Sequence, residues 1–259
     1  MKKDSILRSR KIEKARYRRA EERARRGKPF RLDAKQRKII RKEWPGMWKG
    51  HPCFIFGCGP SLNDLKPYVE EELEQYFLVG VNRAFKLMTP NLTFYQDGCL
   101  YDTEKKYIDR LSKKILVVYR KGYGSVRGIA YRQDTGPGWH LVPDILKLST
   151  AKNSIPGVFE IAQNFGCNPI ILCGVDSTDE TTHVNFCGYN KFHRKKTMQH
   201  ARAGLKWIRR TCKTENINLL CTSKNGILPY TPIEEVLDII KDRGKGKDYY
   251  NKILLRVFE

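Results

Sequence analysis

Short apolar runs alternate with segments of helical pattern between residues 45 and 243. Apolar runs of three to five residues predict strands that are buried on both faces, at Cys53–Phe56, Phe77–Val81, Leu92–Tyr95, Ile115–Tyr119, Pro169–Cys173 and Leu219–Cys221. Helices are predicted over Leu62–Tyr76, Ile155–Phe165, Lys195–Glu215 and Ile233–Asp242. Parallel strands require long crossover connections, which helices supply. The alternation therefore predicts an α/β fold, a Rossmann-like and mostly parallel sheet with helices on both faces.

A basic arm precedes this region. Residues 1–44 contain 19 of the 50 Lys and Arg residues but only 6 of the 28 Asp and Glu residues. The segment has few apolar positions to bury, so it is predicted to be a helical or disordered arm that becomes ordered on a polyanion. Its candidate nucleic-acid contacts are Arg16, Arg18 and Arg19, and a solvated, nonspecific tail is the alternative. The chain is thus divided into the arm 1–44, a folded domain 45–243 and a C-terminal tail 244–259.

Several protein classes are excluded by composition. No run approaches the roughly 18 consecutive apolar residues of a membrane helix, and the charged N-terminus does not resemble a secretory signal. The eight cysteines form no C-x-x-C pair, and several lie in or beside apolar runs. Buried free thiols, no metal site and a cytoplasmic location are therefore expected.

The segment Gly57-Cys58-Gly59-Pro60-Ser61 lies between the first predicted strand and the first predicted helix. In open parallel sheets, ligands bind outside the carboxyl ends of strands and beside helix N-termini. The segment is predicted to bind the phosphates or the ribose of a nucleotide, and a tight strand-to-helix turn without a ligand is the alternative. It is neither a Walker A loop nor a dinucleotide fingerprint, because Gly-Lys-Ser/Thr is missing and Leu62 occupies the third glycine position. Residues 120–152 are predicted to be irregular and to lie over this site.

The wider pattern resembles two related families. Phe54–Leu65, Val79–Phe85 and Tyr95–Asp97 are similar to the N-terminal half of the bacterial sialyltransferases typified by Campylobacter enzymes, which carry a Gly-Asn-Gly-Pro-Ser-Leu loop and a following strand that ends in Asn. The same segments resemble the archaeal 6-hydroxymethylpterin diphosphokinase-like proteins, many of which are virus-encoded. That second resemblance continues through Gly166–Asp176, His183 and Asn218–Ser223, so it covers about residues 52 to 240.

The resemblance implies a Rossmann-like domain that holds a nucleotide donor. Its donor contacts map onto Gly57, Gly59, Pro60, Ser61 and Asn82, and Cys58 stands where the sialyltransferase loop has Asn. His183 follows a strand and a polar loop, so it is expected near the carboxyl edge of the sheet. A neutral imidazole there can accept the proton of an acceptor hydroxyl, and the sialyltransferases place a general-base His at a comparable point. A loop histidine without a role is the alternative.

Asp97 and Asp176 each follow a predicted strand. They are expected to contact the donor through its ribose, or to bind Mg²⁺ if the diphosphokinase resemblance holds, because such enzymes use Mg²⁺ on ATP phosphates. Sialyltransferases of this type need no metal. The two interpretations differ at these carboxylates, and both stay open here, as does the alternative that the carboxylates are helix caps.

A third group of candidate residues is basic. The long helix predicted after residue 194 carries cations at intervals of three to four residues, with apolar side chains on its opposite side. The candidate nucleic-acid contacts in this helix and directly before it are Arg194, Lys195, Lys196, Arg202, Lys206 and Arg209. A solvated helix face explains the stripe alone, but together with the arm it predicts a surface that follows a phosphate backbone.

These features lead to one principal hypothesis. The chain is expected to be a glycosyltransferase that moves a sugar from a nucleotide-sugar to a nucleic acid, with a modified DNA base as the expected acceptor. No cofactor is required beyond the nucleotide-sugar, and no membrane is involved. If the protein is viral, the host cytoplasm is its location. The alternatives are a Mg²⁺-dependent diphosphokinase of the hydroxymethylpterin type and a non-catalytic nucleic-acid-binding module on a transferase fold.

Overall fold

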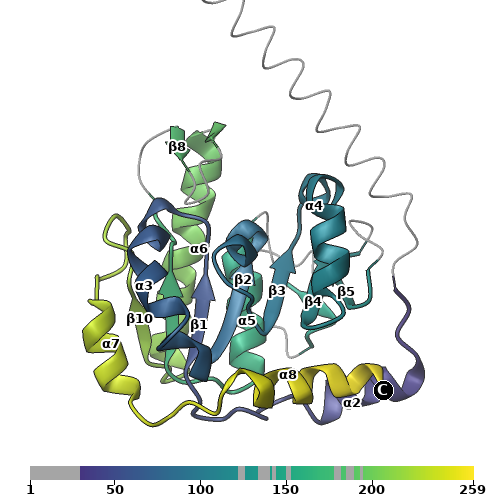
Figure 1. Cartoon of the computed structure of the whole chain (residues 1–259). Helices are drawn as coiled ribbons and strands as arrows, with labels where there is room; N and C mark the ends of the chain where they lie inside the picture. The colour runs from purple at the N-terminus through teal and green to yellow at the C-terminus, as the bar shows by residue number, and fades with distance from the viewer. Residues whose placement is uncertain are drawn as a thin grey trace, which may run out of the picture.

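The computed structural model describes residues 30–121, 126–133, 141, 144–149, 153–177, 182–184, 190–192 and 195–259. Its centre is a sheet of eight strands in the order β10-β7-β1-β2-β3-β4-β5-β6, with every neighbouring pair parallel. Figure 1 shows helices on both faces of this sheet. The structure therefore confirms the predicted α/β, Rossmann-like fold.

The strands of the main sheet are short. They are β1 (Cys53–Phe56), β2 (Phe77–Val81), β3 (Leu92–Tyr95), β4 (Leu116–Arg120), β5 (Ile129–Gln133), β6 (Lys147–Leu148), β7 (Ile170–Cys173) and β10 (Leu219–Cys221). A separate antiparallel pair contains β8 (Thr182–Val184) and β9 (Asn190–Phe192). The helical segments are α2 (Ala34–Lys42), η1 (Pro60–Leu65), α3 (Lys66–Val69), η2 (Leu73–Gln75), η3 (Asn82–Lys86), α4 (Gly98–Leu111), α5 (Ser154–Asn164), α6 (Lys195–Thr214), α7 (Ile233–Ile240), α8 (Lys247–Leu255) and η4 (Arg256–Phe258).

Alternate residues of the strands supply the cores on the two faces of the sheet. In β1, Cys53 and Ile55 pack into the core that α5 and α6 cover, whereas Phe54 and Phe56 pack into the core under η1, α3 and α7. A third cluster lies between β3, β4 and α4. Because side chains alternate across a strand, a sheet covered on both faces needs apolar residues at every position. This explains why β1 and β7 are apolar at every position.

One predicted helix is wrong. Residues 62–76 were expected to form a single helix, but the structure has η1, α3 and η2 there. Pro67 has no N–H to donate to the carbonyl of Asn63, and the Asn63 side chain donates to the Pro60 carbonyl at 3.2 Å. The backbone N–H of Lys66 bonds instead to Asn63 with the tighter 3₁₀ spacing. The segment after the Gly57–Ser61 loop is therefore not a long helix with an anion-binding N-terminus.

The N-terminal and C-terminal segments of the described chain pack against the end of the sheet at which its strands begin. Leu32, Ile40 and Trp44 belong to the main core, although residues 1–44 were expected to form an arm. Figure 1 shows α2 and α8 at the end of the sheet opposite β8, and α2 contacts η4. Tyr250 and Leu254 of α8 are also in this core, so residues 244–259 are not a loose tail. A basic extension without core residues therefore has to end before Phe30.

The region predicted as irregular, 120–152, contributes two further strands. β5 pairs with β4, and β6 pairs with β5 at the edge of the sheet. Ile129, Tyr131 and Leu148 are fully buried in the main core. Of the cysteines, Cys53, Cys167, Cys173, Cys212 and Cys221 are buried free thiols, as expected, and Cys58 is half-buried. Among the described helices, none has the length and hydropathy needed to cross a membrane.

Candidate functional site

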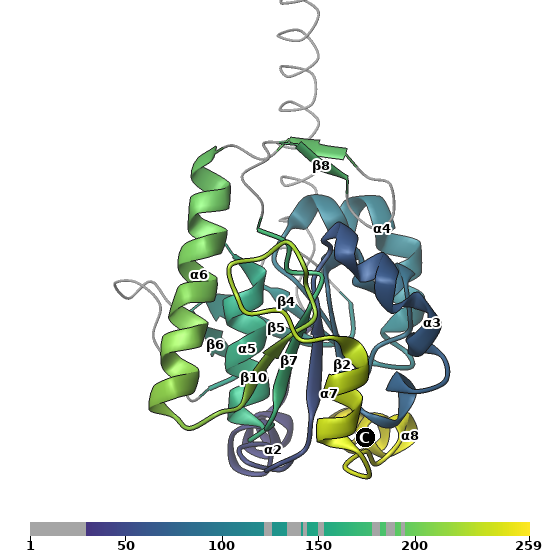
Figure 2. The ribbon, with the colours of Figure 1, turned by 90° about the vertical axis from the view of Figure 1, so that its left-hand side faces the viewer.

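The order in which the chain adds strands to the sheet reverses between β1 and β7. Strands β2 to β6 follow one another on the far side of β1, whereas β10 lies on the far side of β7. The segment after β1 leads to η1 and α3 on one face, whereas the segment after β7 leads, through β8 and β9, to α6 on the other face (Figure 2). In open α/β sheets, ligands bind at the carboxyl ends of strands where the order reverses in this way. Gly57–Ser61 follows β1 and Gly174–Ser177 follows β7, so both segments lie at this point.

The two segments are bonded to each other. Gly57 N–H donates to the Cys173 carbonyl and Gly59 N–H donates to the Gly174 carbonyl, both at 2.7 Å. Asp176 Oδ2 accepts from Ser61 N–H at 3.1 Å and from Ser61 Oγ–H at 2.7 Å. The structure thus brings Gly57, Gly59, Ser61 and Asp176 together, and their polar groups form hydrogen bonds within the protein.

The two glycines are required by this contact between segments. A Cβ atom on Gly57 would lie 2.3 Å from the Gly174 carbonyl oxygen, and a Cβ atom on Gly59 would lie 2.0 Å from Asp176 Oδ2. Both distances are well below van der Waals contact. The sequence predicted that these glycines allow a ligand to approach the backbone. In the structure, the neighbouring segment occupies the space that their missing side chains leave.

These bonds favour one of the two predicted ligand groups. A phosphate cradle requires free N–H groups, yet the N–H groups of Gly57, Gly59 and Ser61 all donate within the protein. The carboxylate of Asp176 also repels a phosphate. Buried side-chain oxygens near this point that lack a partner among the described residues, Asn82 Oδ1 and Asp176 Oδ1, are instead acceptors, which suit the hydroxyl groups of a ribose or another sugar.

Three buried polar atoms in the segments after β2 and β7 have no hydrogen-bond partner among the described residues. They are Asp176 Oδ1, Asn82 Oδ1 and the hydroxyl oxygen of Ser177. Asn82 begins η3 directly after β2 and has φ of 54°, a left-handed conformation that Asn adopts more readily than most residues. Cys58 connects the β1 segment to β2, because its Sγ–H donates to the Val81 carbonyl at 3.2 Å. A buried acceptor without a partner costs free energy unless a ligand supplies the donor.

Ser177 was not among the predicted site residues. It is 3% exposed, although it lies in a polar segment that sequence reasoning treated only as the approach to His183. The sequence signal was its position shortly after a buried strand, next to Asp176.

Asp97 and Asp176 are not brought together. They follow β3 and β7, which are three places apart in the order β7-β1-β2-β3. Neighbouring strands are about 4.8 Å apart, so this order separates the ends of the two strands by about 14 Å. Within the described ranges, no group of three or more His, Cys, Asp or Glu side chains is placed to hold a metal.

His183 lies in β8, where it is paired with Lys191 of β9. Figures 1 and 2 show this antiparallel pair beyond the carboxyl ends of the main strands, on the side where the candidate site lies. The backbone position agrees with the expectation for His183. Its side chain is outside the described part of the structure.

The predicted nucleic-acid contacts fall into three groups. Lys206 and Arg209 are exposed on α6, whereas Arg202 is half-buried and donates from Nε to the Ser177 carbonyl at 3.0 Å. Arg202 thus connects α6 to the segment after β7 and to the candidate site. Lys195 and Lys196 begin α6, with side chains outside the described part. Arg16, Arg18, Arg19 and Arg194 lie outside the described residues.

Comparison with known proteins gives information about the fold. No protein-family model and no curated protein matches the chain. Among solved structures, the chain is similar to the MAf glycosyltransferase from Magnetospirillum magneticum AMB-1, with a TM-score of 0.53 and 14% sequence identity. The match covers 86% of this chain and 41% of that protein. The chain therefore shares a Rossmann-like α/β arrangement with part of a glycosyltransferase, and it spans about two fifths of that protein's length.

Proposed function

We propose that this protein transfers a sugar from a nucleotide-sugar to a hydroxyl group on a nucleic acid, without a metal ion. The observation that carries the proposal is the set of buried acceptor atoms at the reversal point of the sheet, Asn82 Oδ1 and Asp176 Oδ1. Acceptors in this position match the ribose hydroxyls of a nucleotide donor. The similarity in fold to part of a glycosyltransferase supports the same class of reaction.

In the proposed reaction, the acceptor oxygen attacks the anomeric carbon of the bound sugar. The bond from that carbon to the donor phosphate breaks, and the nucleotide leaves with the bonding electron pair. His183 accepts the proton of the acceptor hydroxyl as the new bond forms. The β8–β9 pair holds the backbone of His183 beyond the carboxyl edge, above the proposed donor site.

Charge supports a nucleic acid as the acceptor. The chain has a formal net charge of +22, and residues 1–29 alone contain 13 Lys and Arg residues against 4 Asp and Glu residues. On α6, Lys206, Arg209 and Arg210 add an exposed cationic surface. Lys and Arg residues that neutralise phosphates provide most of the sequence-independent affinity for DNA. If the acceptor hydroxyl is on a base, that base has to be unpaired or flipped out of the helix.

A transfer assay tests the reaction. The full chain is incubated with nucleotide-sugars and with oligonucleotides that carry a hydroxyl group on one base, and transfer is followed by mass spectrometry of the oligonucleotide. We expect turnover that persists in excess EDTA, and a loss of roughly 10²- to 10⁴-fold in His183→Ala with donor affinity unchanged. Turnover that EDTA abolishes and Mg²⁺ restores would support a diphosphokinase-type enzyme. Binding of DNA without any turnover would support a non-catalytic module.

Removal of residues 1–29 tests the acceptor. This truncation removes none of the described core residues, whereas removal of residues 1–44 also deletes Leu32, Ile40 and Trp44. We expect the truncated chain to bind duplex DNA more weakly, and the slope of log affinity against log salt to become shallower by about 0.9 for each phosphate that the arm no longer neutralises. Fluorescence anisotropy at several salt concentrations measures both quantities. Donor affinity is the internal control and should not change. Equal slopes for the two chains would show that the arm does not bind the phosphate backbone.

A further inference from the structure

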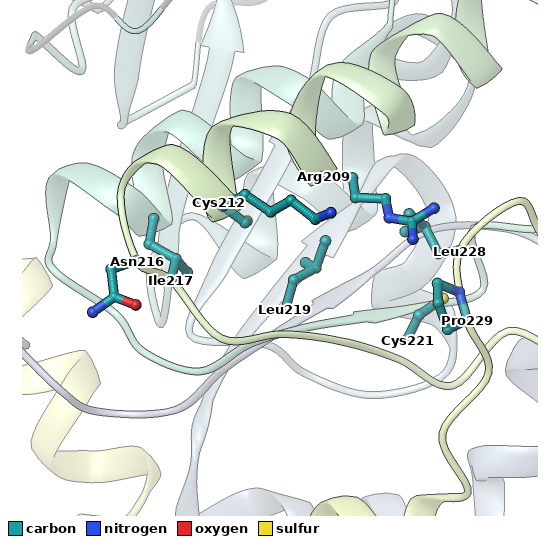
Figure 3. Close-up of a pocket in the computed structure, with 9 residues that line it drawn as sticks. Arg209, Cys212, Asn216, Ile217, Leu219, Cys221, Leu228 and Pro229 are labelled. Carbon is teal, nitrogen blue, oxygen red and sulfur yellow. The ribbon is translucent and has the colours of Figure 1, made fainter.

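A pocket of about 260 Å³ lies on the flank of the sheet, away from the candidate site. It is bounded by the last turns of α6, by the edge strand β10 and by the segment at Leu228 (Figure 3). Leu219, at the amino end of β10, lines it, whereas the candidate site lies at the carboxyl ends of β1, β2 and β7. The pocket is therefore separate from the proposed donor site.

Six of the nine residues that line the pocket are apolar or carry a thiol, and the other three are Arg209, Lys213 and Asn216. Cys212 and Cys221 contribute thiols, and burial raises the pKa of the Cys212 thiol to about 12, so it is neutral at physiological pH. Leu219 and Leu228 complete this surface. In Figure 3, Leu228, Pro229 and Cys221 lie close to the guanidinium end of Arg209. A partly apolar pocket of this size accommodates a small organic group rather than a bare ion.

Two cations line the same pocket without a carboxylate partner. Arg209 and Lys213 are exposed side chains one helical turn apart on α6. Neither forms an ion pair with a described residue. Their charge at the rim favours an anionic group on whatever occupies the apolar interior.

The odd-numbered residues of the edge strand β10 direct their backbone N–H and C=O groups away from β7. Ile170 N–H donates to Asn218 at 2.9 Å, and Thr222 N–H donates to Leu172 at 3.0 Å, so the even-numbered residues of this segment bond to β7. In a parallel ladder, the alternate residues direct their N–H and C=O groups to the opposite side. The Cys221 carbonyl accepts from Thr231 N–H at 2.8 Å on that side, whereas Leu219 faces the pocket.

We infer that this pocket binds a small organic anion, with an apolar body against Cys212, Leu219 and Leu228 and one carboxylate or phosphate group on Arg209 and Lys213. Neither a neutral apolar molecule nor an inorganic anion satisfies both parts of the lining. The inference does not depend on the proposed transfer reaction, because the probes are neither nucleotides nor nucleic acids and no residue of the segments after β1, β2 and β7 lines the pocket.

The test uses the full, ¹⁵N-labelled chain titrated with 4-phenylbutyrate, phenyl phosphate, inorganic phosphate and neutral 4-phenyl-1-butanol. The amide resonances of Leu219 and Asn216 report binding at the pocket. We expect one or both organic anions to bind with dissociation constants on the order of 1 mM. Inorganic phosphate and the alcohol are expected to bind at least tenfold more weakly. The comparison of carboxylate with phosphate identifies the preferred anionic group.

The variant Arg209→Gln/Lys213→Gln is expected to weaken binding of the organic anion by about tenfold or more. Arg210→Gln is the matched control, because Arg210 is exposed on the same helix and does not line the pocket. It should bind like the wild-type chain. Equal binding by wild type and the double variant, an equal loss in the Arg210→Gln control, or no shift of the Leu219 amide with either organic anion would overturn the inference.

Discussion

Gly57→Ala is expected to destabilise the folded chain by about 3 kcal/mol, which lowers Tm by roughly 6–12 °C in a domain of this size. The added Cβ atom would lie 2.3 Å from the Gly174 carbonyl oxygen and 3.0 Å from its carbonyl carbon. Both are backbone atoms of the segment after β7, so no side-chain rotation relieves the collision. Gly57 N–H also bonds to Cys173 at 2.7 Å, and that bond prevents the two segments from separating freely.

The matched control for this prediction is Gly226→Ala. Gly226 is also in a loop, but its nearest neighbour to an added Cβ atom is the Ser223 carbonyl oxygen at 3.7 Å, an ordinary contact. The free energy of unfolding of this variant should be within about 0.5 kcal/mol of that of the wild-type chain. Thermal and urea denaturation of the two variants measure the difference. If Gly57→Ala is as stable as Gly226→Ala, the close packing of the β1 and β7 segments is not as described.

Asn82→Gly is expected to lower the affinity for the nucleotide-sugar by roughly ten- to hundredfold while leaving the free energy of unfolding nearly unchanged. Glycine adopts the φ of 54° at this position without strain, so the substitution removes the side chain and preserves the backbone. What is lost is Asn82 Oδ1, a buried acceptor without a partner among the described residues. Calorimetry with the donor that the wild-type chain uses measures the affinity.

Asn216→Gly provides the control, because Asn216 has the same φ of 54° but lies after α6, away from the carboxyl edge. The same change in backbone entropy therefore occurs at both positions. Donor affinity should be normal in Asn216→Gly. An Asn82→Gly variant that binds the donor like the wild-type chain would remove Asn82 from the site.

The sequence was sufficient to predict six of the eight strands of the main sheet, because strand identity depends on local pattern. The uninterrupted apolar runs at β1, β2, β3, β7 and β10 coincide with the predicted strands to within a residue. They also indicated burial on both faces, which in turn predicted parallel pairing. Helices α5, α6 and α7 begin within a residue of their predicted starts, since their apolar residues recur at the helical period.

Local pattern was insufficient where a distant contact stabilises a segment. Residues 247–255 contain four charged or amide residues, yet α8 is held in the core by the aromatic ring of Tyr250, which contacts Trp48 and Phe77 with ring centroids 5.1 and 5.5 Å apart. Likewise, α2 is strongly basic but buries Ile40, and Arg41 pairs with Asp144 at 3.1 Å. Charge statistics placed α2 in the arm because they do not detect a single well-placed apolar residue.

The candidate site, too, could be predicted from the sequence only in part. The Gly57–Ser61 segment, Asn82 and Asp176 could be selected from the sequence because each follows a buried strand, and the carboxyl ends of parallel strands meet at one edge. The Ser61–Asp176 bond, which converts the expected phosphate cradle into a surface of acceptors, joins residues 115 positions apart. Such a bond exists only after β7 has paired with β1, so tertiary structure alone decides which polar groups of the site are already satisfied and which remain for a ligand.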